Sequence, residues 1–180
     1  IPSGMSPRCR CGTTFFQDAF QVMTGDLHKE IRLVDNQYFA QAAERLASGT
    51  AVRLSVMGNS MLPFIIGGKD QVTLVPYTGQ DLPLGIAALY QWEGKYMIHR
   101  LVKKDESHYH FLGDGNICRF ETIKRNEVLG ILQTIHHPNC KETDATGRCW
   151  LHLGMIWYHI RPVRRYLLFI FRKLFLRSAR

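Results

Sequence analysis

The chain has 180 residues, and 46% of them are hydrophobic, which is enough for one folded domain with short appendages and excludes a largely disordered chain. The net charge of +8 belongs to the end of the chain: residues 145–180 carry eight Arg and Lys and no Asp or Glu, and the preceding residues are neutral overall. A neutral body argues against a nucleic-acid-binding domain, and the basic end indicates a partner of its own.

Residues 1–22 show no clear periodicity, so we expect them to be poorly structured or to precede the true start, which Met5 or Met23 would mark. No segment has the pattern of a signal peptide, and no apolar run reaches about 18 residues. The sequence therefore predicts a protein that is cytoplasmic or peripheral on the cytoplasmic membrane, without a transmembrane span. The five scattered cysteines indicate reduced thiols, and the spacing of Cys9 and Cys11 does not fit a zinc site.

We expect a folded domain over residues 23–138 that begins with a helix over residues 34–48. Gly49 is a natural end for this helix, and Phe39 and Leu46 lie on its apolar face, which suggests that it docks on a core.

From residue 50 the pattern changes to the alternation that is typical of β-strands. Strands are predicted over residues 50–57, 70–77, 85–92, 95–104, 108–112 and 127–136. Short strands joined by glycine turns predict a mainly β, antiparallel, partly closed barrel-like domain.

The C-terminal part is predicted to be a polar linker over residues 139–149 and a basic amphipathic helical tail over residues 150–180. Apolar residues recur at helical spacing in the tail, and cations lie away from them. The apolar set is Leu167, Ile170, Phe171, Leu174 and Phe175, and the cations are Arg164, Arg165, Arg172 and Lys173. We expect this tail to meet an anionic membrane surface, with Trp157 and Tyr158 entering the interface, and packing against the domain or a partner is the alternative.

Ser60 follows a predicted strand within Gly58-Asn59-Ser60-Met61-Leu62-Pro63. Gly58 frees the backbone before the serine, and Met61 and Pro63 fix the direction of the chain after it. A hydroxyl that stands clear of such a turn, close to a backbone N–H, suits a nucleophile. The alternative is an ordinary turn serine.

His99 lies on the predicted strand over residues 95–104, on the same face as Met97 and Leu101. Imidazole is the side chain best suited to take a hydroxyl proton near neutral pH, although a histidine between apolar neighbours is more often part of a core. Asp114, within Gly113-Asp114-Gly115-Asn116, is either an Asx turn or a carboxylate that orients the imidazole.

These motifs together carry a family resemblance over roughly residues 50–136. Ser-Met-x-Pro after a strand, then an His-Arg-containing strand, then a Gly-Asp-Gly-Asn loop resembles the type I signal peptidases and the related LexA-type self-cleaving domains. Many bacterial members have a lysine where this chain has His99, so the chain is more similar to the histidine-base variants of the endoplasmic reticulum and archaea.

The resemblance implies that Ser60 is the nucleophile, His99 the general base and Asp114 the loop acidic residue. It also implies an extended peptide substrate near Met61 and Pro63, and an oxyanion site that includes the Ser60 backbone N–H. The chain departs from the family at Gly58, where a serine often supplies a second oxyanion donor.

The sequence thus predicts a serine endopeptidase that cleaves a leader or signal-like peptide by a Ser-His mechanism, without metal or organic cofactor. Two alternatives stay open: an inactive peptide-binding domain, which the missing second oxyanion donor favours, and a LexA-like transcriptional regulator. The neutral charge of residues 1–144 argues against the regulator, and no nucleic-acid partner is expected.

Overall fold

The computed structural model describes residues 37–116, 119–171 and 173. The expectations for residues 1–22, for the start of the first helix, and for Leu174 and Phe175 lie outside the described residues. The predicted first helix is confirmed in its described part, residues 37–47.

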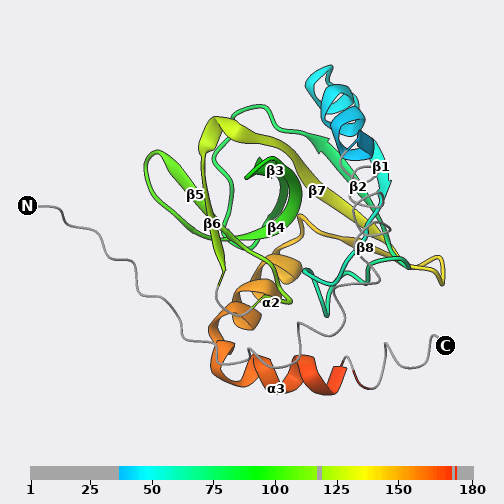
Figure 1. Cartoon of the computed structure of the whole chain (residues 1–180), viewed down its shortest axis with the longest axis vertical. Helices are drawn as coiled ribbons and strands as arrows, with labels where there is room; N and C mark the ends of the chain where they lie inside the picture. The colour runs from blue at the N-terminus through cyan, green and yellow to red at the C-terminus, as the bar shows by residue number, and fades with distance from the viewer. Residues whose placement is uncertain (1–36, 117–118, 172, 174–180) are drawn as a thin grey trace, which may run out of the picture.

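Eight strands form one antiparallel sheet, which Figure 1 shows strongly curled. They are β1 (Val52–Ser55), β2 (Gln71–Pro76), β3 (Ala87–Trp92), β4 (Lys95–Lys104), β5 (His108–Leu112), β6 (Phe120–Lys124), β7 (Val128–His136) and β8 (Glu142–Asp144). The strand order is β1-β2-β7-β3-β4-β5-β6, with β8 paired to β7. The predicted mainly β, antiparallel domain is confirmed, but the sheet is not closed, because β1 and β6 are its two ends and do not pair.

Two strands are not predicted by the sequence pattern. β6 is a five-residue strand with two inward residues, Glu121 and Ile123, and an acidic side chain at an inward position hides the apolar alternation. β8 has three residues and none of them is buried, so it carries no hydrophobic signal. A short 3₁₀ turn, Arg125–Glu127, connects β6 to β7.

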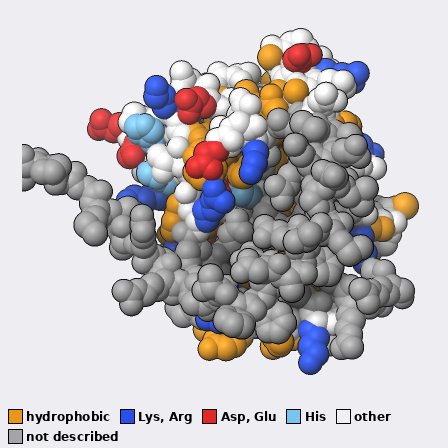
Figure 2. Space-filling model, viewed as in Figure 1, with side chains coloured by type: hydrophobic (Ala, Val, Ile, Leu, Met, Phe, Trp, Pro, Cys, Tyr) orange, Lys and Arg blue, Asp and Glu red, His pale blue; other side chains and the backbone are white. Residues whose placement is uncertain are grey.

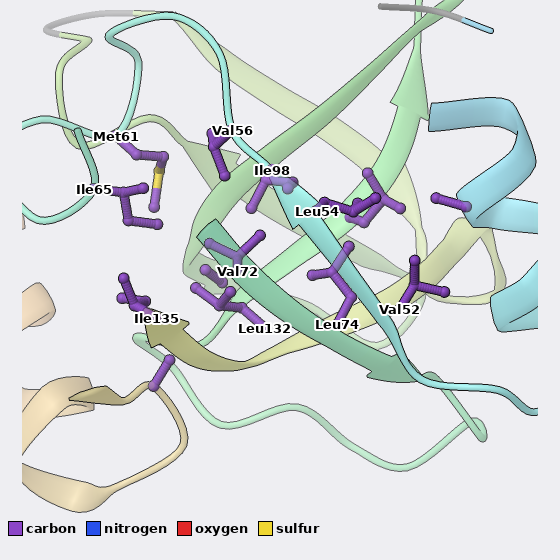
Figure 3. Packing of buried hydrophobic residues seen from close by; sticks show 14 of the residues in the cluster. Val52, Leu54, Val56, Met61, Ile65, Val72, Leu74, Ile98, Leu132 and Ile135 are labelled. Carbon is purple, nitrogen blue, oxygen red and sulfur yellow. The ribbon is translucent and has the colours of Figure 1, made fainter. Parts of the chain in front are cut away.

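Buried side chains pack into two clusters. The first joins β1, β2 and β7 to the helix over residues 37–47, through residues that include Leu54, Leu74 and Leu132 (Figure 3). The second gathers aromatic and aliphatic residues of β3, β4 and β5, among them Tyr109 and Phe111. Complete burial of such side chains contributes roughly 1.5–3 kcal/mol each, so the two clusters fix the curl of the sheet.

The C-terminal segment is part of the domain, which corrects the expected linker and tail. The expected linker contains β8 and the start of α2 (Arg148–His159), and Ala145 N–H donates to the Gln133 carbonyl. Trp150 of α2 is 8% exposed and belongs to the first core cluster. A second helix, α3 (Arg161–Phe171), follows at the lower edge of the molecule in Figure 1. None of the described helices is long and apolar enough to cross a membrane.

Candidate active site

Ser60 lies on a tight loop that follows β1. The chain turns at Gly58, whose φ of +84° is a conformation that mainly glycine adopts. A Cβ on Gly67 would overlap the backbone of Gly58, so two glycines allow the two sides of the loop to approach closely. Ser60 itself is half-buried.

Met61 anchors this loop in the core, and Pro63 lies next to that anchor in the chain. Met61 is 2% exposed and packs with Ile65 in the first core cluster, as Figure 3 shows. Pro63 is half-buried, and neither residue lines the cavity beside Ser60. Met61 thus points into the core and away from the cavity, and the expected contact of Met61 and Pro63 with a substrate stays a prediction that the cavity lining does not support.

Ser60 and His99 line the same cavity, which has a volume of about 570 Å³. Its walls come from the helix over residues 37–47, the segment after β1, strand β4, the loop after β5, and β6. The described lining residues are Phe39, Val56, Met57, Ser60, Tyr96, Met97, Ile98, His99, Gly115, Asn116, Arg119 and Glu121. The structure thus brings the predicted nucleophile and base to one cavity, which is apolar on much of its wall and polar beside Ser60.

Glu121, which the sequence did not single out, holds the far side of the imidazole. His99 Nδ1 lies 3.0 Å from Glu121 Oε2, and the two side chains are 5% and 1% exposed. Because an ionised carboxylate only accepts hydrogen bonds, Nδ1 carries the proton of the neutral ring and Nε2 keeps its lone pair. The sequence signal for Glu121 is an acidic residue that shares the inward face of a strand with Ile123.

Tyr90 completes this buried group. Its hydroxyl donates to Glu121 Oε2 at 3.2 Å and lies 3.3 Å from His99 Nδ1. Burial, and then the charge of Glu121, raise the pKa of Tyr90. The phenol therefore stays protonated and supports Glu121 with a hydrogen bond.

The loop over residues 113–116 surrounds Ser60 from the other side. Gly115 N–H donates to the Ser60 carbonyl at 2.7 Å. A Cβ on Gly113 would lie 2.6 Å from that carbonyl and 3.0 Å from His99 Nε2, so both atoms flank the same point. Nε2 therefore faces the Ser60 loop, and the two glycines leave room for this approach.

Asp114 does not orient the imidazole, and that expectation is wrong. Its carboxylate accepts three hydrogen bonds from Arg100: from Nε at 2.9 and 3.1 Å and from Nη2 at 2.7 Å. Successive residues of a strand point to opposite faces, so His99 and Arg100 reach different partners. Asp114 therefore fixes the glycine loop beside Ser60 through Arg100 rather than through His99.

Small residues of β3 make room for both side chains of β4. In the antiparallel register, Ala88 lies opposite His99, and Ala87 lies opposite Arg100. Both alanines are fully buried. Larger residues at these positions would crowd the imidazole or the guanidinium, so β3 contributes to the site without touching a substrate.

Helix α2 covers Arg100. The guanidinium donates to the Gly85 carbonyl at 2.6 Å and lies 5.1 Å from the ring centres of Phe64 and Trp150. Gly154 of α2 packs so closely that a Cβ there would overlap the guanidinium. Farther along α2, Trp157 Nε1–H donates to the Asp114 carbonyl at 2.9 Å. The indole of Trp157 is thus fixed on the domain, and its expected entry into a membrane interface stays a prediction.

The oxyanion side of the site rests on backbone groups. The Ser60 N–H donates to no acceptor among the described residues, so no described group competes with a developing negative charge for it. The Ser60 hydroxyl also makes no hydrogen bond to a described residue, and the Ser60–His99 bond is therefore not formed in this structure. Bonds of this kind often tighten when a substrate is bound.

Comparisons with known proteins add no family to this description. No protein-family model matches the chain, and no curated protein matches its sequence. Among the described residues, no group of three His, Cys, Asp or Glu side chains is placed to hold a metal ion. The description of the site therefore rests on the geometry of its side chains.

Proposed function

We propose that this protein is a serine endopeptidase of the signal-peptidase and LexA type, with Ser60 as nucleophile, His99 as general base and Glu121 as the carboxylate that orients the base. One observation carries the proposal: Ser60 and His99 line one cavity while Glu121 holds Nδ1 of the imidazole at 3.0 Å. A nucleophile, a base and a group that orients the base are the parts that acyl transfer requires.

The reaction follows from the positions of these groups. His99 Nε2 takes the proton of the Ser60 hydroxyl as Oγ attacks the peptide carbonyl carbon. The oxyanion that forms is stabilised by the Ser60 N–H. His99 then gives the proton to the leaving amine, which leaves an acyl ester on Ser60. A water molecule, deprotonated by His99, hydrolyses that ester.

Glu121 acts at the steps in which the imidazole is positively charged. Its carboxylate is buried and within 3.0 Å of Nδ1, so its charge stabilises the imidazolium in a poorly solvated place. Tyr90 keeps Glu121 in position through the bond to Oε2. Neither residue needs to touch the substrate.

The cavity suits an extended peptide with an apolar side chain near the scissile bond. Val56 and Met57 continue β1, which is an end strand of the sheet and has one edge that no described strand pairs with. A peptide can pair with such an edge through its backbone. Ile98 and Met97 of β4 add apolar wall beside His99. Leader or signal-like segments have this chemistry.

The test uses a phosphonate probe that reacts with activated serines, together with a leader-peptide substrate. We expect the wild type to gain the mass of one adduct on Ser60 and to cleave the peptide. Ser60→Ala and His99→Ala should lose both properties while their melting temperatures stay close to that of the wild type. Ser55→Ala, a change at an exposed serine on β1, is the matched control and should behave as the wild type. Cleavage by folded Ser60→Ala would refute the proposal.

A non-catalytic peptide-binding domain is the second candidate. Two features favour it: the Ser60 hydroxyl makes no hydrogen bond to a described residue, and position 58 is a glycine rather than a serine that could add an oxyanion donor. Saturable binding of the leader peptide without a probe adduct on Ser60, at any pH between about 6 and 9, would support this candidate over the peptidase.

A further inference from the structure

Helix α3 exposes apolar side chains and buries a cation. Arg164 and Leu168 share one side of the helix and are 1% and 4% exposed. On the opposite side, Tyr166 and Phe169 are each 67% exposed. Val163, Leu167 and Ile170 are also exposed. At helical spacing, Val163, Tyr166, Phe169 and Ile170 form one outward stripe, which we call the outer face of α3.

This arrangement reverses the one that a surface helix normally has. Amphipathic helices of globular proteins turn their apolar stripe toward the core and their cations toward water. Here the buried side of the helix includes Arg164, one of the cations that the sequence pattern places away from the apolar stripe. Figure 2 shows hydrophobic side chains at the lower edge of the molecule, where α3 lies in Figure 1. Exposed apolar groups of this kind mark a surface with a partner.

The exposed charges of α3 and of the described residue after it have one sign. Arg165 of α3 and Lys173 beyond its end are exposed. No Asp or Glu occurs from residue 145 to residue 180, so no acidic side chain of this segment can compensate these cations. The complementary partner therefore offers apolar and negatively charged groups together.

A lipid surface fits this combination better than a protein groove or a second copy. The outer face protrudes from the helix and forms no groove. It presents aromatic side chains beside cations, and this combination is typical of helices that lie in a membrane interface. A second copy would bring the same cations against themselves, which is unfavourable. Helix α3 has 11 residues and is about 16 Å long, too short to cross a bilayer, so it would lie along the surface.

We propose that the outer face of α3 docks on a membrane surface rich in anionic lipid. Phe169 and Tyr166 enter the interface, and Arg165 and Lys173 lie at the level of the phosphates. Of the residues that the sequence suggested for this contact, Tyr158 instead stays on the domain, where it packs on Phe120. This inference is independent of the proposed peptidase activity, because none of the described side chains of α3 lines the cavity.

The experiment is flotation of the full chain with vesicles of phosphatidylcholine alone and of phosphatidylcholine mixed with phosphatidylserine. We expect the wild type to float with the mixed vesicles and to bind the neutral ones about tenfold more weakly. The double change Tyr166→Ser and Phe169→Ser should weaken binding to mixed vesicles by about tenfold or more. Arg165→Gln should weaken binding to mixed vesicles alone.

The matched control is Leu84→Ser, a similar loss of an exposed apolar side chain, 41% exposed and outside α3. It should bind as the wild type, and thermal melting should show that every variant is folded. Failure of the wild type to float with mixed vesicles would overturn the proposal. So would a double variant that floats unchanged, or one that loses self-association instead, because a second copy would then be the occupant.

Discussion

Replacing Glu121 by glutamine tests the assignment of the orienting carboxylate. The change keeps the size of the side chain and removes its charge. The Tyr90 hydroxyl and His99 Nδ1 contact the same oxygen, Oε2, so the new amide places either its oxygen or its NH₂ group before both of them. With the oxygen there, both hydrogen bonds remain, but the negative charge that stabilises the imidazolium is gone. With the NH₂ group there, Nδ1 must accept, the ring carries its proton on Nε2, and His99 cannot take the proton of Ser60.

The size of the effect follows from the loss of the charge beside His99 and of the partner that fixes its tautomer. Both side chains are almost fully buried, so water cannot replace the lost partner. The corresponding loss of charge in the serine-protease triad lowers kcat by about 10⁴, and each tenfold is about 1.36 kcal/mol. We therefore expect Glu121→Gln to lower kcat by about 10³ to 10⁴, or roughly 4–5.5 kcal/mol of transition-state stabilisation, and to change KM little.

Asp114→Asn is the matched control, because it makes the same chemical change at the other buried carboxylate. Arg100 would lose its counter-charge, and breaking a buried pair costs about 3–5 kcal/mol. We expect that loss in the free energy of unfolding, measured by urea denaturation, and a much smaller change in kcat on the leader peptide. The reasoning fails if Glu121→Gln keeps kcat within about tenfold of the wild type. It fails equally if Asp114→Asn is as stable as the wild type but inactive.

Three further predictions concern packing, loop geometry and pH. Gly154→Ala should lower the free energy of unfolding by about 1–2 kcal/mol, because overpacking against Arg100 outweighs the gain of about 1 kcal/mol in helix propensity. An unchanged melting temperature would contradict this prediction. Gly115→Ala should reduce kcat about a hundredfold and leave the melting temperature normal. The new Cβ would overlap the Asn59 carbonyl and shift the loop away from Ser60. Full activity of this variant would refute the role given to the loop. Backbone hydrogen bonds from His108 and Ser107 lower the pKa of Asp105. The ionised carboxylate therefore stabilises the folded protein fully above about pH 4, and this contribution is lost as the pH falls through the folded-state pKa. Asp105→Asn should be less stable than the wild type near neutral pH, and a difference in the free energy of unfolding that does not shrink in acid would disprove the assignment.

The sequence predicted Ser60 and His99 because each lies in a short motif that is local in the chain. The sequence pattern assigned Asp114 to His99, because the order of motifs along the chain does not show which face of a strand a later loop contacts. His99 and Arg100 are adjacent, so their side chains point apart, and the loop after β5 returns on the side of Arg100. Glu121 reaches His99 only through the pairing of β6 with β5, and that pairing is not visible in the spacing of residues.

The C-terminal segment shows a different limit of sequence reasoning. Trp150, Gly154 and Trp157 recur at helical spacing, and this stripe is the signal that α2 docks on a core. The concentration of cations in residues 145–180 outweighed that signal and suggested a separate tail. Charge composition describes a whole segment, whereas docking depends on one face of a helix.

The cover that α2 places over Arg100 decides where a working fragment of this protein can end. A chain cut after residue 138 would retain every described residue that lines the cavity. It would nevertheless leave the guanidinium of Arg100 open to water and remove the Trp157 bond to the Asp114 carbonyl. Screening or crystallisation fragments should therefore run through His159, because the last turn of α2 supports a loop that lies beside the nucleophile.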